Sequence, residues 1–202
     1  MKVESSSLHS LTNIHIDDNA LGGLRISSIM DSTISQSSFD NTTAGVGLAF
    51  VSGSNTGNQT LNSTANSNFM EGLAIHNGTG LNLFSGLTVN SNTEEGITLN
   101  GAHSNTLTGS TVDSNGKDGV TLSNSTGNVF SDLQVNNNTW YGIRTDTAST
   151  GNQFLNNTAT GNAIRVDIND ATGATFADLL NIWIGNVCDN DNPDGICSPP
   201  AS

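Results

Sequence analysis

Residues 92–122 read NTEEGITLNGAHSNTLTGSTVDSNGKDGVTL, and one short pattern stands at both ends of this stretch. Asn92 and Asn115 are each followed four residues later by a glycine and then by an apolar–any–apolar triplet. A fixed period of this length is typical of a solenoid. The pattern continues outward, with steps of 24, 23 and 23 residues between glycines, through Gly72-Leu73-Ala74-Ile75, Gly96-Ile97-Thr98-Leu99, Gly119-Val120-Thr121-Leu122 and Gly142-Ile143-Arg144-Thr145.

The repeat favours strands over helices. Within a repeat the apolar residues alternate with others, as Leu73 and Ile75 do, and a period of two indicates a β-strand. Asn, Ser, Thr and Gly fill the segments between, and these residues favour turns. Each repeat has room for three short strands and three turns. We therefore predict an all-β fold, a right-handed single-stranded parallel β-helix of about six to seven rungs.

Equivalent residues of successive rungs should form columns, because neighbouring strands lie ~4.8 Å apart. Asparagine tolerates the left-handed backbone of a sharp corner, and stacked amides can hydrogen-bond as a ladder. Two inward columns are expected, one bulky and one small. The bulky column is Phe84, Leu107, Phe130 and Phe154, with Thr60 as an early exception, and the small column is Ala65, Val89, Val112, Val135 and Ala159. The first asparagine column is Asn58, Asn82, Asn105, Asn128 and Asn152, and the second is Asn68, Asn92, Asn115 and Asn138.

The pattern weakens at both ends. Gly23 fits a first complete rung, and either Gly45 or Gly47 begins the next. Downstream, Ala163-Ile164-Arg165-Val166 is predicted to be the next strand, with Ala163 in place of the glycine and a shorter step from Gly142 than between earlier glycines. We predict repeats over residues 1–170, with a truncated N-terminal edge to which Leu8, Leu11, Ile14 and Ile16 belong. Residues 171–202 are predicted to form a C-terminal cap around Phe176, Leu179, Leu180, Ile182 and Trp183.

Composition limits the classes of function. The chain has 202 residues, 11% of them charged, and a net charge of −13 with only five Lys and Arg. Nucleic-acid binding is excluded on this basis, because the phosphate backbone demands a basic face. No apolar run is long enough for a transmembrane helix, so membrane insertion is not expected. Met1-Lys2 begins no signal peptide, and the uncapped first rung favours a segment of a longer polypeptide.

The two cysteines, Cys188 and Cys197, lie nine residues apart in the tail. A disulfide here would close a short loop and would indicate an oxidising compartment. Two free thiols are the alternative. The spacing is not the Cys-x-x-Cys of a metal site, so the disulfide is preferred.

The Asn-x3-Gly rungs and their spacing resemble the right-handed parallel β-helix repeat superfamily, which has the pectin-lyase-like fold, over about residues 11–170. The tail, from Asn181-Ile182-Trp183 to Gly195-Ile196-Cys197, resembles the closing segment of secreted bacterial β-helix proteins. The superfamily includes polysaccharide lyases, mannuronan C5-epimerases, pectinases, phage tailspikes and NosD-like periplasmic proteins. The resemblance implies an extracellular, periplasmic or cell-envelope location, but fold alone does not choose a function.

One region combines aromatic, cationic and acidic residues. Outward positions on the glycine strands include Arg144 and Asp146, and we expect Arg165 and Asp167 to stack on them one rung later. Lys117 and Asp118 lie nearby. A solvated ladder of ion pairs is the alternative reading. The predicted substrate-binding residues are Trp140, Tyr141, Arg144, Asp146, Arg165 and Asp167.

A catalytic site is harder to support. Tyr141-Gly142-Ile143 resembles the start of the epimerase motif, but that family continues with Asp-Pro-His where this chain has Arg144-Thr145-Asp146. The histidine and its partner are absent, so the activity is not transferred. No catalytic residue is assigned, and no role is assigned to any of the four histidines.

A calcium site is the remaining candidate. Residues 190–195, NDNPDG, match the opening of a calcium loop, with Asn190, Asn192 and Asp194 as candidate ligands. Ala201 stands where the closing glutamate would be, so an acidic turn closed by the disulfide is the simpler reading.

We therefore expect a secreted β-helix module that faces carbohydrate or acts as a scaffold, with calcium as its one possible cofactor and a polysaccharide as its possible partner. A polysaccharide lyase or C5-epimerase whose site is incomplete here is the first alternative. An ice-binding face is the second, from Thr98 and Thr121 in one outward column that Arg25, Ala74 and Arg144 interrupt.

Overall fold

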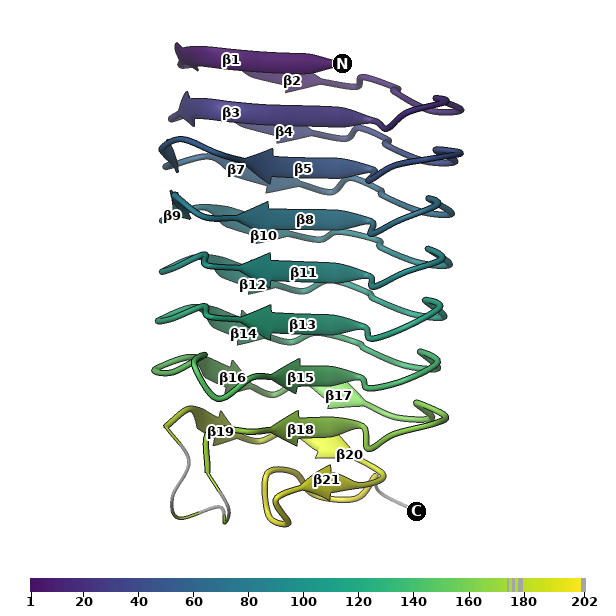
Figure 1. The fold of residues 1–202 in the computed structure, drawn as a ribbon, viewed down its shortest axis with the longest axis vertical. Coiled ribbons are helices and arrows are strands. Elements are labelled where there is room, and N and C mark those ends of the chain that lie inside the picture. The colour runs from purple at the N-terminus through teal and green to yellow at the C-terminus, as the bar shows by residue number, and fades with distance from the viewer. Residues whose placement is uncertain (174, 176, 178–179, 201–202) are drawn as a thin grey trace.

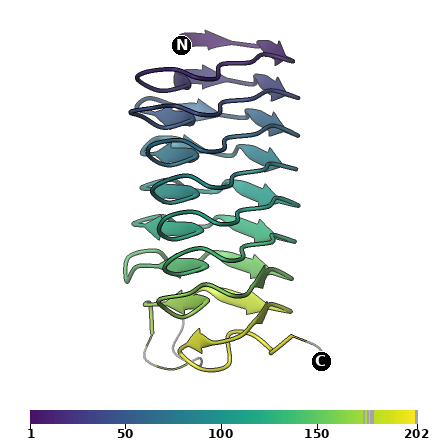
Figure 2. The same cartoon turned by 90° about the vertical axis from the view of Figure 1, so that its right-hand side faces the viewer.

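The chain forms a rod of stacked turns in a computed structural model that describes residues 1–173, 175, 177 and 180–200 (Figure 1). The view turned by 90° shows that each turn is a flattened loop with strands on different sides (Figure 2). All strand pairs are parallel, and partner residues lie one turn apart in sequence, as with Ile97 and Val120. No helix in the described part of the chain is long and apolar enough to cross a membrane.

Two long sheets and one short sheet run along the rod. Sheet A has 11 strands, of which nine follow one another along the axis, namely β1 (Lys2–Ser7), β3 (Leu24–Met30), β5 (Leu48–Val51), β8 (Leu73–His76), β11 (Ile97–Asn100), β13 (Val120–Ser123), β15 (Ile143–Thr145), β18 (Ile168–Asp170) and β21 (Asp191–Asn192). The two others are β6 (Asn55–Thr56) and β9 (Thr79–Gly80), which extend it past the end of β3.

Sheet B has eight strands, one for each turn. The turn count is therefore about eight rather than six to seven, and the difference comes from turns at the two ends. The strands of sheet B are β2 (Ser10–Thr12), β4 (Thr33–Ser35), β7 (Gln59–Leu61), β10 (Leu83–Ser85), β12 (Thr106–Thr108), β14 (Val129–Ser131), β16 (Gln153–Leu155) and β19 (Ile182–Ile184). The short third sheet joins β17 (Thr158–Ala159) to β20 (Val187–Cys188).

The core is a set of inward columns, as predicted. Phe84 pairs with Thr60 on one side and with Leu107 on the other, and Leu107 pairs with Phe130. Lower in the rod, Phe130 and Phe154 stack with ring centroids 4.8 Å apart and planes within 8°. Trp183 continues the stack on Phe154, with ring centroids 3.8 Å apart and planes within 6°.

Both asparagine columns form continuous ladders of buried amides. Asn115, for example, accepts from Asn92 Nδ2 at 2.9 Å and donates through its own Nδ2 to Asn138 Oδ1 at 2.9 Å. Because every amide donates toward the C-terminal end, the last position needs a group that only accepts. Carboxylates end the two ladders: Asp167 accepts from Asn162 at 2.7 Å, and Asp170 accepts from Asn181 at 3.1 Å.

The register near the C-terminus corrects one prediction. Ile143 pairs with Ile168 and Arg144 with Asn169, so the strand after the last glycine repeat is Ile168–Asp170 and not residues 163–166. The step lengthens instead of shortening, because one extra residue separates Asn162 from Asp167, which occupies the position of Gly142. The glycine-strand pattern is lost here, since an aspartate replaces the glycine that stands at this position in each turn from Gly23 to Gly142.

The ends of the rod also differ in part from expectation. Leu48 pairs with Leu24, so Gly47 and not Gly45 begins the second complete rung. Leu8 is 80% exposed, whereas Leu11, Ile14 and Ile16 pack against the core as expected of a preceding rung. At the other end β19, β20 and β21 pair with β16, β17 and β18, so the tail continues all three sheets. Leu180 and Ile182 are exposed and do not form an apolar cap, and Phe176 and Leu179 lie outside the described residues.

Candidate functional site

The outward face of sheet A carries most of the chemically distinctive side chains. In three successive turns that enter sheet A strands, charged or aromatic residues stand one and two positions before the glycine: Glu94 and Glu95, then Lys117 and Asp118, then Trp140 and Tyr141. Backbone hydrogen bonds from Lys117 to Glu94 and from Trp140 to Lys117 hold these turns in register. On the strands themselves, one outward column contains Arg25, Ala49, Ala74, Thr98, Thr121, Arg144 and Asn169.

Two cations lie against two aromatic rings on this face. Lys117 Nζ lies 5.8 Å from the centre of the Trp140 ring, and the Arg144 guanidinium lies 5.7 Å from the centre of the Tyr141 ring. Both distances are within the range of a cation–π contact. Trp140 remains 38% exposed, and 40% of the Arg144 side chain is exposed, so both groups are open to a ligand.

A buried carboxylate fixes the arginine and the tyrosine. Asp118 Oδ2 accepts from Thr121 Oγ1 at 2.8 Å and lies 3.4 Å from Arg144 Nη1. Asp118 Oδ1 accepts from the backbone N–H of Tyr141 at 3.1 Å. The Asp118 side chain is only 1% exposed, so the ion pair joins a rigid acceptor to a half-exposed guanidinium. This arrangement limits the freedom of Arg144 before any ligand arrives.

Acidic side chains surround Lys117. Its ammonium group pairs with Glu94 and lies 3.9 Å from Glu95 Oε1. The hydrogen bond to Glu94 raises the pKa of Lys117 above its ordinary value. Burial raises the pKa of Glu95, and the nearby Asp118 and Glu71 carboxylates act in the same direction, against the lowering by its backbone hydrogen bond and by Lys117.

Three of the six predicted binding residues come together, and three do not. Trp140, Tyr141 and Arg144 form the cluster described above. Asp146 lies on the same face, but its carboxylate is occupied by hydrogen bonds within the fold. It accepts from Ser149 Oγ at 2.7 Å and from Ser123 Oγ, one turn earlier, at 2.9 Å. Burial acts to raise the pKa of Asp146, but these hydroxyls together with two backbone N–H groups hold it below the ordinary value.

Arg165 and Asp167 do not stack on Arg144 and Asp146, because the register pairs Arg144 with Asn169. Asp167 is 1% exposed, and its second oxygen accepts from the backbone N–H groups of Asp189 and Asn190 at 3.0 and 3.2 Å. It is therefore a structural residue. Arg165 is exposed in the turn before β18.

Sequence analysis did not identify the acidic residues of the cluster. Glu94 and Glu95 stand one and two positions before their glycine. Lys117 and Asp118 stand at the same positions one rung later, and Trp140 and Tyr141 in the rung after that. Aligning those two columns by the glycines would have placed the acids beside Lys117. The signal was therefore present in the spacing.

The tail loop gives no support to the predicted calcium site. Asn190 Oδ1 accepts from the backbone N–H of Asp167 at 2.9 Å, and the Asn192 amide donates to Asn169 Oδ1 at 2.8 Å. Both side chains therefore have protein partners, and Asp194 is exposed.

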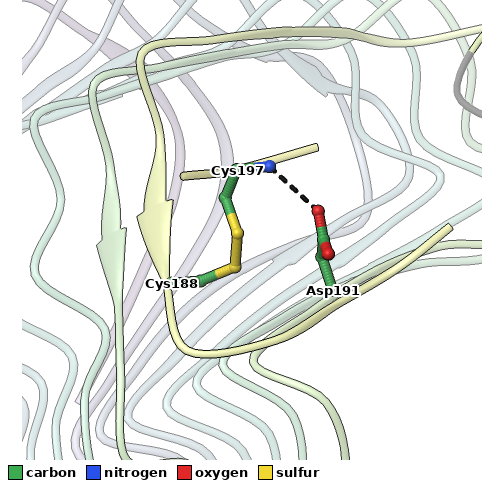
Figure 3. A group of neighbouring side chains, drawn as sticks. All are labelled: Cys188, Asp191 and Cys197. Atoms are coloured by element: carbon green, nitrogen blue, oxygen red, sulfur yellow. Dashed lines mark hydrogen bonds between the residues drawn. A yellow bond between two sulfur atoms is a disulfide. The ribbon is translucent and has the colours of Figure 1, made fainter. Parts of the chain in front are cut away.

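Cys188, Asp191 and Cys197 bring their ligand atoms within 4.8 Å of one another, but the two sulfurs form the predicted disulfide (Figure 3). Asp191 Oδ2 accepts from the backbone N–H groups of Gly195 and Cys197, each at 3.0 Å. Sulfurs bonded to each other cannot act as thiolate ligands. The three residues form a closed turn.

The outward column does not form a flat threonine face. Thr121 donates to Asp118, and Thr98 Oγ1 is buried without a partner in the described part of the chain. Arg25 and Arg144 interrupt the column with long charged side chains. The ice-binding alternative therefore has no support on this face.

Solved structures of several proteins share the fold. The mannuronan C-5 epimerase AlgE6 A-module of Azotobacter vinelandii has a TM-score of 0.69 at 16% identity, over 94% of this chain and 59% of that chain. Pectate lyase Pel9A has a TM-score of 0.75 at 13% identity, over 100% of this chain and 59% of that chain. The tailspike protein 2 active domain of bacteriophage CBA120 has a TM-score of 0.56 at 19% identity, over 89% of this chain and 27% of that chain.

This chain therefore spans less than two thirds of the length of the two enzymes. No curated protein matches the sequence. A family model described as a right-handed β-helix region matches residues 49–179, which is more than half of the chain. The strand order, the parallel register and this match agree, and the chain belongs to the right-handed β-helix family.

Proposed function

We propose that the sheet A face around Lys117, Trp140, Tyr141 and Arg144 binds an acidic polysaccharide built from uronate sugars. The observation that carries the proposal is the pair of cation–aromatic contacts, Lys117 with Trp140 and Arg144 with Tyr141, on one half-exposed surface. A flat aromatic ring can cover the apolar face of a sugar ring. A guanidinium can hold a carboxylate through two hydrogen bonds.

The two cations distinguish this surface from most of the molecule. The net charge of −13 means that most of the protein surface repels anions, so an anionic ligand has few other places to bind. Asp118 already orients Arg144, so less conformational freedom is lost when a ligand binds. The same acid pairing reduces the positive charge available, which predicts weak affinity, or binding that needs a bridging divalent cation such as calcium.

The fold relatives support the ligand class. Two of them are named as a mannuronan epimerase and a pectate lyase, and a third as a periplasmic alginate epimerase with a TM-score of 0.60 at 14% identity over 90% of this chain and 55% of that chain. A disulfide is typical of oxidising compartments. Together these support an extracellular, periplasmic or cell-envelope location for this protein.

Binding is favoured over uronate cleavage or epimerisation by the state of the candidate bases. Lys117 keeps its proton because its pKa is raised by Glu94, so it is a poor proton acceptor. Asp146 has a lowered pKa, and hydrogen bonds to its own turn engage its oxygens. A lyase or epimerase needs a base beside the cation that holds the carboxylate. Neither Lys117 nor Asp146 meets that requirement.

The test is a calorimetric titration of the protein with oligogalacturonate and with oligomannuronate, each with and without calcium. Arg144→Ala should weaken binding at least about tenfold, or 1.4 kcal/mol, because it removes the bidentate contact. Arg144→Lys should lose less, and Trp140→Ala should weaken binding without changing its salt dependence.

Lys2→Ala is the matched control, since Lys2 is an exposed cation in β1 that is paired with Glu4. It should leave the affinity unchanged. An assay for unsaturated uronate products on the same samples should remain negative, and product that disappears in Arg144→Ala would instead support the lyase. If no uronate oligomer binds, the proposal is wrong, and a structural scaffold is the remaining role.

A further inference from the structure

A groove lies on sheet A near the N-terminal end of the rod, away from the cluster around Arg144. Its volume is about 410 Å³, within the range of small-molecule sites. Most of the lining side chains are apolar, and they include Leu21, Ala49, Val51 and Met70. The charged or titratable side chains in the lining are Arg25 and His76.

The groove exists because small residues line it. Ala49 lines the groove and occupies the outward column where Thr98, Thr121 and Arg144 stand further along the rod. On the turn side, Gly22, Gly23 and Gly45 carry no side chains. Leu21, 87% exposed, and Met70, 39% exposed, then form an apolar rim beside Ala49, which is the floor of the groove. Exposed apolar side chains that gather around a hollow mark a binding surface more often than isolated ones do.

Arg25 differs from Arg144 in its partners. Arg144 pairs with Asp118, and the other cation of that cluster, Lys117, pairs with Glu94. In the described part of the chain, the Arg25 guanidinium has no ion pair or side-chain hydrogen bond. The His76 imidazole likewise has no hydrogen-bond partner there. The groove therefore combines an unneutralised cation and a free imidazole with an apolar floor, on a protein whose net charge is −13.

The geometry points to a binding site for a small carboxylate with an apolar body, such as a short-chain fatty acid. The carboxylate pairs with Arg25 through two hydrogen bonds, and the imidazole of His76 supplies a further donor. The apolar body lies on Ala49 and under Met70, which removes its surface from water. A neutral apolar molecule would leave Arg25 unpaired, and a fully hydrophilic anion would leave the floor uncovered.

This site is separate from the proposed polysaccharide surface. Arg25 and Arg144 share one outward column but stand five rungs apart, which is about 24 Å at ~4.8 Å per rung. The inference does not rest on the proposed function. Either site can fail experimentally while the other stands.

The experiment uses hexanoate as the probe and follows the four histidines by ¹H–¹³C NMR of the full chain. Hexanoate should shift the His76 resonances saturably, while those of His9, His15 and His103 stay in place, because none of these three lines the groove. Hexanamide, the neutral match of nearly the same shape, should produce no saturable shift over the same concentrations.

Three variants separate the contribution of the charge from that of the cavity. Arg25→Ala should lower the affinity for hexanoate at least tenfold, and Arg25→Lys should retain part of it. Ala49→Leu fills the floor while Arg25 stays in place, and it should abolish binding. Circular dichroism and a melting curve confirm that each variant is folded.

Arg144→Ala should leave the hexanoate affinity unchanged. The inference is overturned if His76 does not respond, if hexanamide binds as tightly as hexanoate, or if Arg25→Ala binds like the original protein. Loss of hexanoate binding in folded Arg144→Ala would also overturn it, since the two sites would then be one.

Discussion

The side chain of Asn115 uses all of its hydrogen-bonding capacity inside the rod. Its oxygen accepts from the backbone N–H of Asn92 at 3.0 Å and from the Asn92 amide at 2.9 Å. Its own amide donates to Val89 O at 3.1 Å and to Asn138 Oδ1 at 2.9 Å. The residue is fully buried, so water cannot replace these partners. A buried polar group of this kind stabilises a fold only while every bond is made.

Asn115→Ala is expected to destabilise the protein by about 3–4 kcal/mol, because it leaves two donors of Asn92 and the carbonyl of Val89 buried without partners at about 1–3 kcal/mol each, less than additively. Denaturant unfolding measures the loss. Asn100→Ala is the control, since Asn100 is exposed at the end of β11. Equal stabilities for the two variants would show that the ladder contributes nothing.

At the scale of elements, the disulfide joins β20 to the segment that follows β21. Cys188 in β20 is 1% exposed, its Cα lies 5.8 Å from that of Cys197, and Ile196 beside the latter is buried in the core. The bridge thus holds Ile196 over the end of the stack. Without it, the segment after β21 would be held by the burial of Ile196 and by the backbone hydrogen bonds between Ser198 and the β20 segment.

Reduction of the disulfide should destabilise the protein by about 2–3 kcal/mol, the chain-entropy value for a loop of about ten residues. Melting curves recorded with and without a phosphine reductant measure the effect. Because the bond lies in the last turns, hydrogen exchange should accelerate in β20 and β21 and stay unchanged in β8. A uniform acceleration along the rod, or an unchanged melting temperature, would contradict this account.

Sequence reasoning succeeded for elements wherever the glycine and asparagine columns were both intact. From Gly47 to Gly142 every turn carries the glycine, and the predicted register holds throughout. It failed at Asp167, where a ladder-ending carboxylate replaces the glycine after an extra residue. No periodic signal marks that substitution, because a group that only accepts hydrogen bonds is required only at the last position of a ladder.

The candidate site was predictable only in part for the same reason. Trp140, Tyr141 and Arg144 stood out by residue type within the regular repeats, whereas Arg165 was assigned by extending the period past its end. The groove at Arg25 was not predictable from spacing alone. The groove depends on the alanine at an outward position and on Gly22 and Gly45 in the adjacent turns. The space that these small residues leave is visible only when the positions of the surrounding side chains are known.

At the scale of the whole molecule, the carboxylates give stability a distinct dependence on pH. Burial raises the pKa of Glu95 and of Asp113 above ordinary values of 4.5 and 3.8. The folded chain therefore holds these protons more tightly than the unfolded chain, and stability rises as pH falls from neutrality toward those values. Asp146 has a lowered pKa, so its contribution is present above 3.8 and is lost as pH falls below it.

We therefore expect the free energy of unfolding to be greatest at mildly acidic pH and to decline on both sides. Relief of the net charge of −13 acts in the same direction as the pH falls from neutrality. Glu95→Gln should raise stability at neutral pH and flatten the slope between neutral and mildly acidic pH. Urea unfolding at a series of pH values measures both. A slope that stays the same in Glu95→Gln would remove Glu95 as its source.

Because the inner turns pair in the same register, whole turns could be added or removed without breaking the strand pairing. Removing residues 97–119 would join Gly96 to Val120, place Asn82 next to Asn128 and Asn92 next to Asn138, and leave both asparagine ladders continuous. Each turn of a solenoid contacts only its neighbours, so the shortened rod would lose one unit of stability, together with Lys117 and Asp118, which lie in that turn. It would also bring Arg25 and Arg144 one step closer. Gene duplication of a whole turn between the two surfaces could thus increase their separation, whereas this deletion also removes part of the polysaccharide surface.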